Sequence, residues 1–201
     1  MQKTFVPSEW EEKLYAQWEQ KGVFTAKADP KKEAFSIILP PPNANADLHV
    51  GHAMYVYEDA MIRYNKLQGK EVLWLPGADH AGFETQFVYE KHLAKQDKSR
   101  FDFPREELFQ NIWDFVMQNR ETMENQLRKL GFALDWEKKK FTMDDDIVAI
   151  VYQTFERMFN EGLIYRDLKL VNYSPFDGTA FSDLEVLHEE RQDNLWHILY
   201  K

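Results

Sequence analysis

The sequence predicts an α/β fold in which two parallel strands are connected by a helix. Two short apolar runs, residues 35–39 and 71–75, have the length and residue types of buried strands. Between them, residues 50–68 have apolar residues at helical spacing, and Gly69 follows as a typical helix stop. A strand, a helix and a second strand in this order indicate a parallel pair with a right-handed crossover. Ligands of such sheets bind beyond the carboxyl ends of the strands, where we therefore expect the functional site.

The composition is that of a folded domain with a sizeable core. Of the 201 residues, 44% are hydrophobic and 15% aromatic, which suffices for one domain or for one domain and the beginning of another. The net charge of −9 argues against a general nucleic-acid-binding surface, because phosphate contacts require clustered lysine and arginine. The absence of cysteine excludes disulfides and thiolate zinc sites. No apolar run approaches the ~18 residues of a membrane helix, and we expect a cytoplasmic protein without a membrane segment.

Residues 8–21 are predicted to form a short helix that packs on the main domain and ends before Gly22. Ser8 and Glu11 have the spacing of a capping box at its start. Its apolar face is expected to consist of Trp10, Leu14 and Trp18.

Three longer helices carry apolar stripes that we expect to belong to the core. They cover residues 50–68, residues 105–130, and a segment capped by Thr142 and Asp145 that ends near residue 160. The stripes consist of Tyr57, Ala60, Met61, Tyr64 and Leu67; of Leu108, Ile112, Phe115, Val116, Met123, Leu127 and Leu130; and of Ile147, Ile150, Val151, Phe155 and Met158.

A first motif lies between the first strand and its helix, where residues 40–53 read Pro-Pro-Pro-Asn-Ala-Asn-Ala-Asp-Leu-His-Val-Gly-His-Ala. The prolines hold the chain extended as it leaves the strand. His49 and His52 lie at the start of the helix, where unpaired N–H groups and the helix dipole favour an anion. Gly51 has no side chain, so a flat ligand can lie against the backbone there. The pattern predicts a site for a phosphate and a base, although two such histidines can also be ordinary caps or metal ligands.

A second motif follows the second strand, where residues 75–86 read Leu-Pro-Gly-Ala-Asp-His-Ala-Gly-Phe-Glu-Thr-Gln. Its acidic residue, Asp79, can cap the following helix. Beside the first motif, the same carboxylate suits the α-ammonium of an amino acid, because a charge-assisted hydrogen bond fixes the orientation of the ligand. The two roles are alternatives at this point.

The first motif resembles the HIGH signature of the class I aminoacyl-tRNA synthetases, and its three prolines with asparagine resemble their valine/isoleucine/leucine subgroup. The second motif is similar to the loop Leu-Pro-Gly-x-Asp-His-Ala-Gly-x-x-Thr-Gln of the valyl members. Residues 179–186, Thr-Ala-Phe-Ser-Asp-Leu-Glu-Val, resemble a further stretch of the same members. The resemblance covers nearly the whole chain.

The resemblance implies the first half of a class I synthetase Rossmann-like parallel-sheet catalytic domain, with helical additions. It assigns residues 1–30 to an N-terminal helical segment and residues 31–190 to this half-domain. Residues 191–201 are expected to begin an inserted editing domain, with its first strand at residues 194–201. We therefore expect the chain to be the N-terminal portion of a longer enzyme.

The reaction implied by the resemblance is the activation of valine with ATP and Mg2+, followed by transfer of valine to tRNA(Val). The catalytic residues would be His49 and His52. The valine-binding residues would be Pro41, Asn43 and Asp79, and the ATP-binding residues would be Pro42, His49, Gly51 and His52. No metal site is expected in the protein itself, because the spacing of His49, His52 and His80 matches no common metal pattern.

The chain departs from the family pattern in two places. It has Ala44-Asn45-Ala46 where the family has Val-Thr-Gly, and Tyr173 and Ser174 where the valyl members have tryptophan and cysteine. The second ATP motif of the family, KMSKS, is missing from the sequence. We therefore expect weak or no valine activation, and no tRNA charging, by this chain alone.

The resemblance implies a monomeric full-length enzyme, whereas apolar surfaces left open in this portion favour self-association. Two alternative functions stay open. One is a free-standing nucleotidyltransferase with the same His-x-Gly-His turn, and the other is a synthetase-derived module that binds a nucleotide or an amino acid without catalysis.

Overall fold

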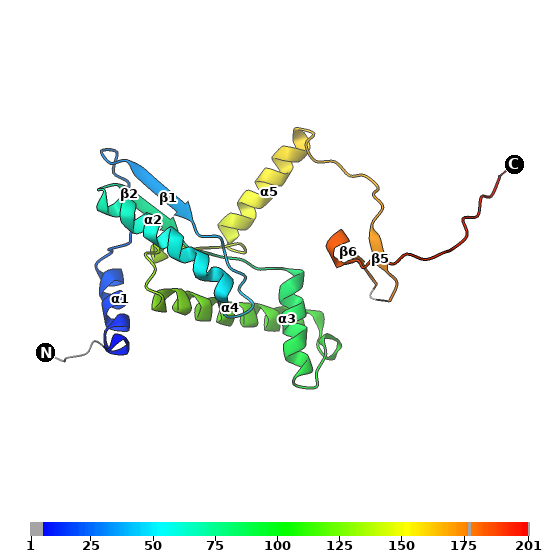
Figure 1. Cartoon of the computed structure of the whole chain (residues 1–201), viewed down its shortest axis with the longest axis horizontal. Helices are drawn as coiled ribbons and strands as arrows, with labels where there is room; N and C mark the ends of the chain where they lie inside the picture. Colours follow the sequence, from blue (N-terminus) through cyan, green and yellow to red (C-terminus); the bar gives the residue numbers. More distant parts are fainter. Residues whose placement is uncertain (1–5, 177, 201) are drawn as a thin grey trace. The chain divides into compact units, whose positions relative to one another are not determined.

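The computed structural model describes residues 6–176 and 178–200. The chain divides into two compact units, residues 1–154 and residues 155–201. Figure 1 follows the elements along the chain. The helices are α1 (Glu11–Gln20), α2 (Tyr55–Leu67), α3 (Phe83–Ala94), α4 (Arg105–Lys129) and α5 (Asp145–Asn160), with short 3-10 helices at Pro7–Glu9, Val50–Met54, Arg100–Asp102, Trp136–Lys138 and Asp183–Glu185. The strands are β1 (Ala34–Ile38), β2 (Glu71–Leu75), β3 (Gly77–Ala78), β4 (Lys140–Phe141), β5 (Asn172–Ser174) and β6 (Thr179–Phe181).

The predicted parallel pair is confirmed by β1 and β2, which pair in parallel from Ala34 opposite Glu71 to Ile38 opposite Leu75. Helix α2 connects them and packs against both strands. The buried Leu39 extends the ladder by donating its N–H to the carbonyl of Leu75 at 3.0 Å. Both strands therefore end side by side, and the two motif loops leave the sheet at the same edge.

Two shorter pairs complete the sheet structure. Strands β3 and β4 pair in parallel in the first unit. In the second unit, β5 and β6 form an antiparallel hairpin. The expected strand at residues 194–201 is not formed over residues 194–200, and Lys201 lies outside the described residues.

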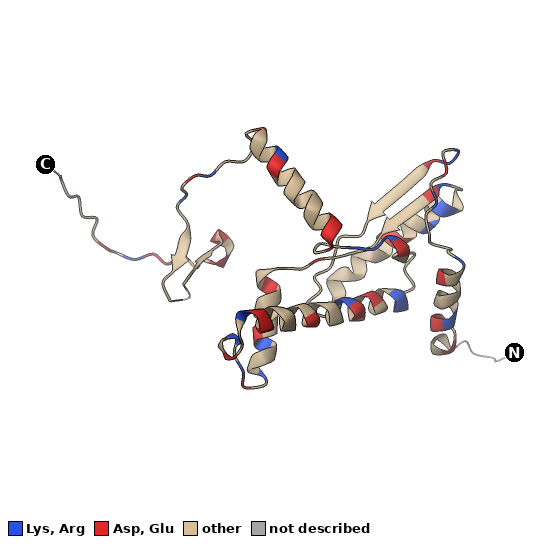
Figure 2. Ribbon diagram, turned by 180° about the vertical axis from the view of Figure 1, so that it is seen from behind, with Lys and Arg blue, Asp and Glu red and all other residues tan. Residues whose placement is uncertain are grey.

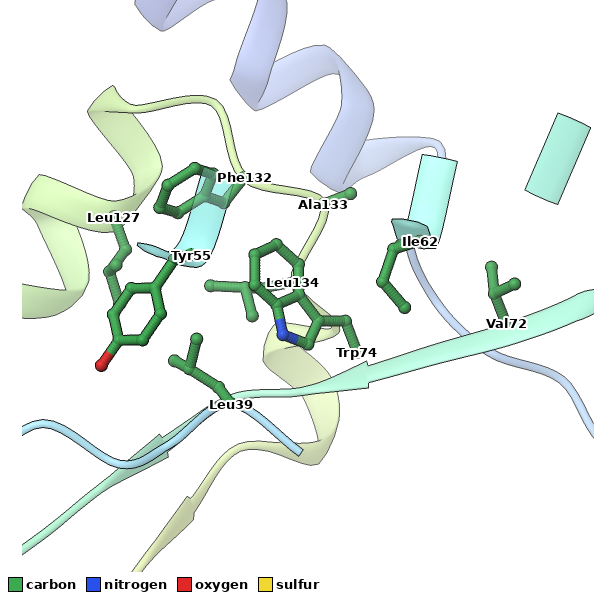
Figure 3. Packing of buried hydrophobic residues seen from close by; sticks show 9 residues of the cluster. All are labelled: Leu39, Tyr55, Ile62, Val72, Trp74, Leu127, Phe132, Ala133 and Leu134. Atoms are coloured by element: carbon green, nitrogen blue, oxygen red, sulfur yellow. The ribbon is translucent and has the colours of Figure 1, made fainter. Parts of the chain in front are cut away.

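The main core forms where α2, α4 and β2 meet the segment after α4. Figure 3 shows its side chains pointing towards one another around Trp74, which packs on Phe132 with 5.4 Å between ring centroids. The indole Nε1–H of Trp74 donates to Glu58 Oε2 at 3.1 Å, so its polar atom has a partner. The cluster consists of Leu39, Tyr55, Ile62, Val72, Trp74, Leu127, Phe132, Ala133 and Leu134.

A second cluster lies under the motif loops. Ala44 of the first loop and Ala78 of the second pack with Val116 and Met123 of α4 and with Phe141. The partly buried Leu48 packs against both clusters. The irregular segment between β1 and α2 is thus anchored in the core.

Helix α1 differs from the prediction in its start and in its buried face. It begins at Glu11 after the 3-10 helix, and its N-cap, Trp10, makes no side-chain capping bond, so the predicted Ser8 capping box is wrong. Trp10 is 55% exposed, whereas Tyr15 is buried. The Tyr15 hydroxyl donates to the carbonyl of Phe132 at 2.8 Å and accepts from Trp136 Nε1 at 2.8 Å. These two hydrogen bonds explain why the helix turns this face inwards.

The predicted core stripe of α2 is also wrong, because its side chains are exposed. Tyr57 is 78% exposed, and Met61, Tyr64 and Leu67 are exposed as well. The buried residues of α2 are Tyr55 and Ile62, which face the strand pair. The helix is apolar on more than one side, so its spacing alone does not identify the side that packs.

The structure confirms α4 as a core helix but not α5. Val116, Met123 and Leu127 of α4 are buried, whereas Leu130 after its end is exposed. Helix α5 crosses the boundary between the two units and contains no buried residue. Its predicted cap is wrong too, because α5 begins at Asp145, three residues after Thr142, and the Thr142 hydroxyl instead accepts the N–H of His80 at 2.9 Å.

Figure 2 shows acidic and basic residues interleaved along α4. Near the C-terminal end of α4, the buried Glu124 accepts from Arg120 Nε at 3.0 Å and from Lys139 Nζ at 2.8 Å, and Arg128 lies 3.8 Å away. Because these cations surround the carboxylate, the buried charge is compensated.

Two buried tyrosines should make folding sensitive to alkaline pH. Burial raises the pKa of Tyr15 to about 12 and, together with the nearby Glu58, that of Tyr55 to about 12. An unfolded tyrosine titrates near ~10, so above that pH the unfolded chain loses protons that the folded chain retains. The stabilising contribution is therefore complete below pH ~10 and is lost as the pH rises through ~12.

Urea unfolding between pH ~8 and ~12 measures this loss. We expect Tyr15→Phe and Tyr55→Phe each to flatten the decrease in unfolding free energy, and Tyr57→Phe, at an exposed position, to leave it unchanged. A decrease that is equally steep in all three variants would contradict the prediction.

Candidate active site

The two motif loops are joined directly through their backbones. The N–H of Asp79 donates to the carbonyl of Pro42 at 2.9 Å, and the N–H of Ala44 donates to the carbonyl of Asp79 at 2.8 Å. These bonds form an isolated parallel bridge between Asn43 and Asp79. The structure therefore brings together two of the predicted valine-binding residues at the carboxyl ends of β1 and β2.

Gly77 allows the proline segment to pack against the second loop. A Cβ atom at this position would lie 3.2 Å from Pro41 Cβ and 3.8 Å from the carbonyl of Lys140. Pro41 and Asn43 are exposed, whereas Pro42 between them is buried. Two of the three residues thus have exposed side chains, and Pro42 contributes its carbonyl to the bridge.

Asp79 faces the first loop without serving as a helix cap. Helix α3 begins at Phe83 with Gly82 as its N-cap, so the alternative role of Asp79 as a cap is wrong. Among the described residues, none donates a hydrogen bond to its half-buried carboxylate. Asn43 Nδ2 lies 3.4 Å from a second carboxylate, that of Glu84. Two carboxylates, those of Asp79 and Glu84, therefore belong to the bridge or lie beside it, which suits a cationic ligand group.

The two histidines of the first motif form a compact pair. Their ring centroids lie 4.1 Å apart. His49 is the N-cap of the 3-10 helix Val50–Met54, and its Nδ1 accepts the N–H of Gly51 at 3.1 Å. The N–H of His49 in turn donates to Nδ1 of His52 at 3.0 Å. Each imidazole is therefore held by a backbone N–H group of the same turn.

These contacts determine where each imidazole carries its proton. An N–H group can only donate, so both Nδ1 atoms accept, and a neutral ring then has its proton on Nε2. The carbonyl of His49 also lies 3.2 Å from Nδ1 of His52. A proton on that Nδ1 would bond to this carbonyl but would face the N–H of His49. Burial lowers the pKa of His52, which favours its neutral form.

Gly51 is required by the position of the His49 ring. A Cβ atom on Gly51 would lie 2.8 Å from Cε1 and 2.9 Å from Nδ1 of His49, which is closer than real Cβ contacts. The space above Gly51 is therefore filled by the imidazole that its N–H binds.

The second loop repeats this arrangement at His80 and Gly82. Nδ1 of His80 accepts the N–H of Gly82 at 3.1 Å, so this ring is also arranged to carry its proton on Nε2. The Thr142 hydroxyl holds the backbone of His80 from the end of β4. Neither His80 nor Thr142 is among the predicted site residues; the His-x-Gly spacing shared by both loops is the signal that indicates His80.

Glu84 and Gln126 were also missed. Glu84 contacts Asn43 through its carboxylate, and Gln126 of α4 hydrogen-bonds to Asp47 and Leu48, directly before His49. Among residues 6–176 and 178–200, no group of three histidine or acidic side chains is placed to hold a metal ion. In the same residues, no helix combines the length and the apolar character needed to cross a membrane.

The sequence matches the family described as tRNA synthetases class I (I, L, M and V) over residues 13–199. Similar curated proteins are the valine--tRNA ligases of Gluconobacter oxydans, 45% identical over the whole chain, and of Aquifex aeolicus, 42% identical over 98% of it. That of Geobacter sulfurreducens is 43% identical over 98% of the chain. The chain spans 23%, 17% and 22% of these three relatives, respectively.

The fold is similar to that of a solved structure, the ternary complex of Agrobacterium radiobacter K84 agnB2 LeuRS, tRNA and LeuAMS. The TM-score is 0.73 over 92% of this chain and 22% of that one, with 20% sequence identity. The likeness confirms the predicted α/β architecture.

Proposed function

Because the chain belongs to the class I tRNA synthetases, we propose that it is part of a valine--tRNA ligase and binds valine and ATP at the joined motif loops. The observation that carries the proposal is the backbone bridge between Asn43 and Asp79. It places an exposed amide beside a free carboxylate at the edge of the sheet where ligands of parallel strands bind. The names of the three similar proteins support valine as the amino acid.

Different residues would bind the charged ammonium group of valine and the rest of the molecule. The Asp79 carboxylate accepts from the α-ammonium group, which a charge-assisted hydrogen bond orients. Pro41 and Asn43 are exposed next to it and contact the rest of the amino acid. The valine carboxylate is then free to attack the α-phosphate of ATP, which enters with Mg2+. The bond between the α- and β-phosphates breaks, so that valyl-adenylate forms and pyrophosphate leaves.

His49 and His52 would act on the phosphate. Negative charge builds on the α-phosphate oxygens in the transition state, and donors already in position stabilise it without rearrangement. The Nε2–H groups of both imidazoles are such donors, because each Nδ1 is occupied by a backbone N–H. Gly51 and Pro42 would shape the proposed ATP site indirectly, because the N–H of Gly51 holds the His49 ring and the carbonyl of Pro42 accepts the N–H of Asp79.

The later steps would belong to the longer enzyme. We infer that valine is transferred from valyl-adenylate to the 3′ end of tRNA(Val) in the cytoplasm, with release of AMP. Residues 31–190 would form the first half of the catalytic domain, after a helical segment at residues 1–30. Residues 191–201 would begin the inserted editing domain.

The test is a titration of the 15N-labelled chain with Mg-ATP and with valine, followed by the amide signals of both loops. We expect ATP to shift the signals around Gly51 and valine to shift those around Asp79. His52→Ala should weaken ATP binding about tenfold or more, because it removes a hydrogen bond to a charged group. His92→Ala, at an exposed histidine of α3, is the matched control and should bind as the unchanged chain does.

Isoleucine, leucine and threonine serve as competing amino acids in the same titration, and ATP–pyrophosphate exchange is measured in parallel. We expect valine to bind best and exchange to be weak or undetectable. The proposal fails if neither ligand shifts the loop signals, or if His52→Ala and His92→Ala bind ATP equally. Exchange driven by a phosphate ester in place of an amino acid would identify a nucleotidyltransferase instead.

A further inference from the structure

The segment between β1 and His49, residues 39–48, is held at two points. At its start, the bridge to Asp79 fixes Pro42 and Ala44. At its end, the side chain of Gln126 binds the two residues that precede His49. The N–H of Leu48 donates to Gln126 Oε1 at 2.9 Å, and Gln126 Nε2 donates to Asp47 Oδ1 at 2.9 Å.

We propose that Gln126 is a positioning residue for the two imidazoles of the candidate active site. Both ends of its amide are used, one by an N–H group and one by a carboxylate. The amide therefore has one orientation, because an inverted amide would place its NH2 group against an N–H and its oxygen against the carboxylate.

The support behind Gln126 is rigid. It lies on α4 between Met123 and Leu127, which are buried in the two core clusters. Core side chains are closely packed and hold such a helix in place. Gln126 thus fixes residues 47 and 48, which belong to no strand or helix, relative to the core helix α4.

Leu48 restricts the position of His49, because the two residues are neighbours and their Cα atoms lie about 3.8 Å apart. His49 then determines the position of His52, since its N–H donates to Nδ1 of His52. A chain of direct contacts therefore runs from α4 through Asp47 and Leu48 to both rings. The Leu48 side chain, packed against both clusters, adds a second anchor at the same point.

The inference rests on the proposed function in one respect, namely that His49 and His52 bind the phosphate. The test below separates the positioning role of Gln126 from that phosphate-binding role. Two-bond 1H–15N spectra of the histidine rings report the protonated nitrogen of each imidazole without any ligand. In the unchanged chain we expect His49 and His52 to show the Nε2–H form. In Gln126→Leu, which keeps the volume but removes both hydrogen bonds, we expect both rings to lose this fixed signature.

His80 is an internal control, because its ring has the same type of backbone bond but Thr142 holds its loop. Its signals should stay unchanged in Gln126→Leu, which distinguishes a local effect from unfolding. Gln118→Leu, at an exposed glutamine of the same helix, should leave all three rings unchanged.

A polarity swap provides the rescue. Gln126→Glu alone should abolish the fixed Nε2–H signature of both rings, because the new carboxylate repels that of Asp47. Adding Asp47→Asn should restore the Nε2–H signature, since the asparagine amide donates to the new carboxylate while Leu48 keeps its acceptor. ATP affinity should follow the ring signals, with a decrease of about fivefold in Gln126→Leu and recovery in the double variant.

The inference is overturned if the His49 and His52 signals are the same in Gln126→Leu as in the unchanged chain, or if those of His80 change with them. If the rings respond as expected but the unchanged chain binds no ATP, the proposed function fails and the positioning role stands. If ATP binds and the rings do not respond, the proposed function stands without the positioning role.

Discussion

Replacing Trp74 with alanine is expected to lower the free energy of unfolding of the first unit by about 4 kcal/mol. Trp74 is 1% exposed and packs at the centre of the main cluster. The substitution leaves a cavity beneath Phe132 and Leu134 and removes the partner of the Glu58 carboxylate. Burial already raises the pKa of Glu58, against the opposing effect of the indole hydrogen bond.

Urea unfolding monitored by circular dichroism measures the effect, and Trp10→Ala is the control. Both variants lose one tryptophan, but Trp10 is exposed, and its replacement should change the unfolding free energy by less than about 1 kcal/mol. Equal losses in the two variants would show that Trp74 is not the centre of the core.

Gly51→Ala is expected to weaken ATP binding about tenfold while leaving the fold intact. The new methyl group would overlap Cε1 and Nδ1 of His49, so the ring must turn away. Turning breaks the bond from the N–H of Gly51 and moves the proposed phosphate donor. The turn is exposed, so the rotated ring can enter solvent, and we expect the thermal midpoint to change little.

The measurement is the same ATP titration, combined with the histidine ring spectra. Val50→Ala is the control, because it shortens an exposed side chain in the same turn and introduces no overlap. If Gly51→Ala keeps both the His49 ring signature and the ATP affinity, the close approach of the ring to Gly51 has no functional role.

The parallel strand pair, α4 and the two motif loops could be predicted because each is encoded locally. The strands are apolar runs, and Gly131 follows the C-cap residue of α4. The loops are dense in proline, glycine and histidine, whose backbone and hydrogen-bonding properties are specific. For such segments a few neighbouring residues determine the conformation.

The buried faces of α1 and α2 could not be predicted in this way. Tyr15 is buried because Phe132 and Trp136 offer hydrogen-bond partners, and Tyr55 because the strand pair lies beneath it. Periodicity identifies an apolar side of a helix but not the surface that covers it. The contacts of Gln126 with Leu48 and of Thr142 with His80 likewise join distant segments, and the sequence contains no local signal for them.

The bridge between the two loops consists of backbone groups, and any residue except proline supplies the N–H groups that it requires at positions 44 and 79. Only the size of the side chain at Ala44 is restricted, because Ala44 is buried. Evolution can therefore exchange side chains in this loop while the path of the backbone is inherited unchanged. The Ala44-Asn45-Ala46 sequence in place of Val-Thr-Gly is an exchange of this kind. It changes the chemical groups next to the proposed ligand site and leaves the backbone bridge between Asn43 and Asp79 in place.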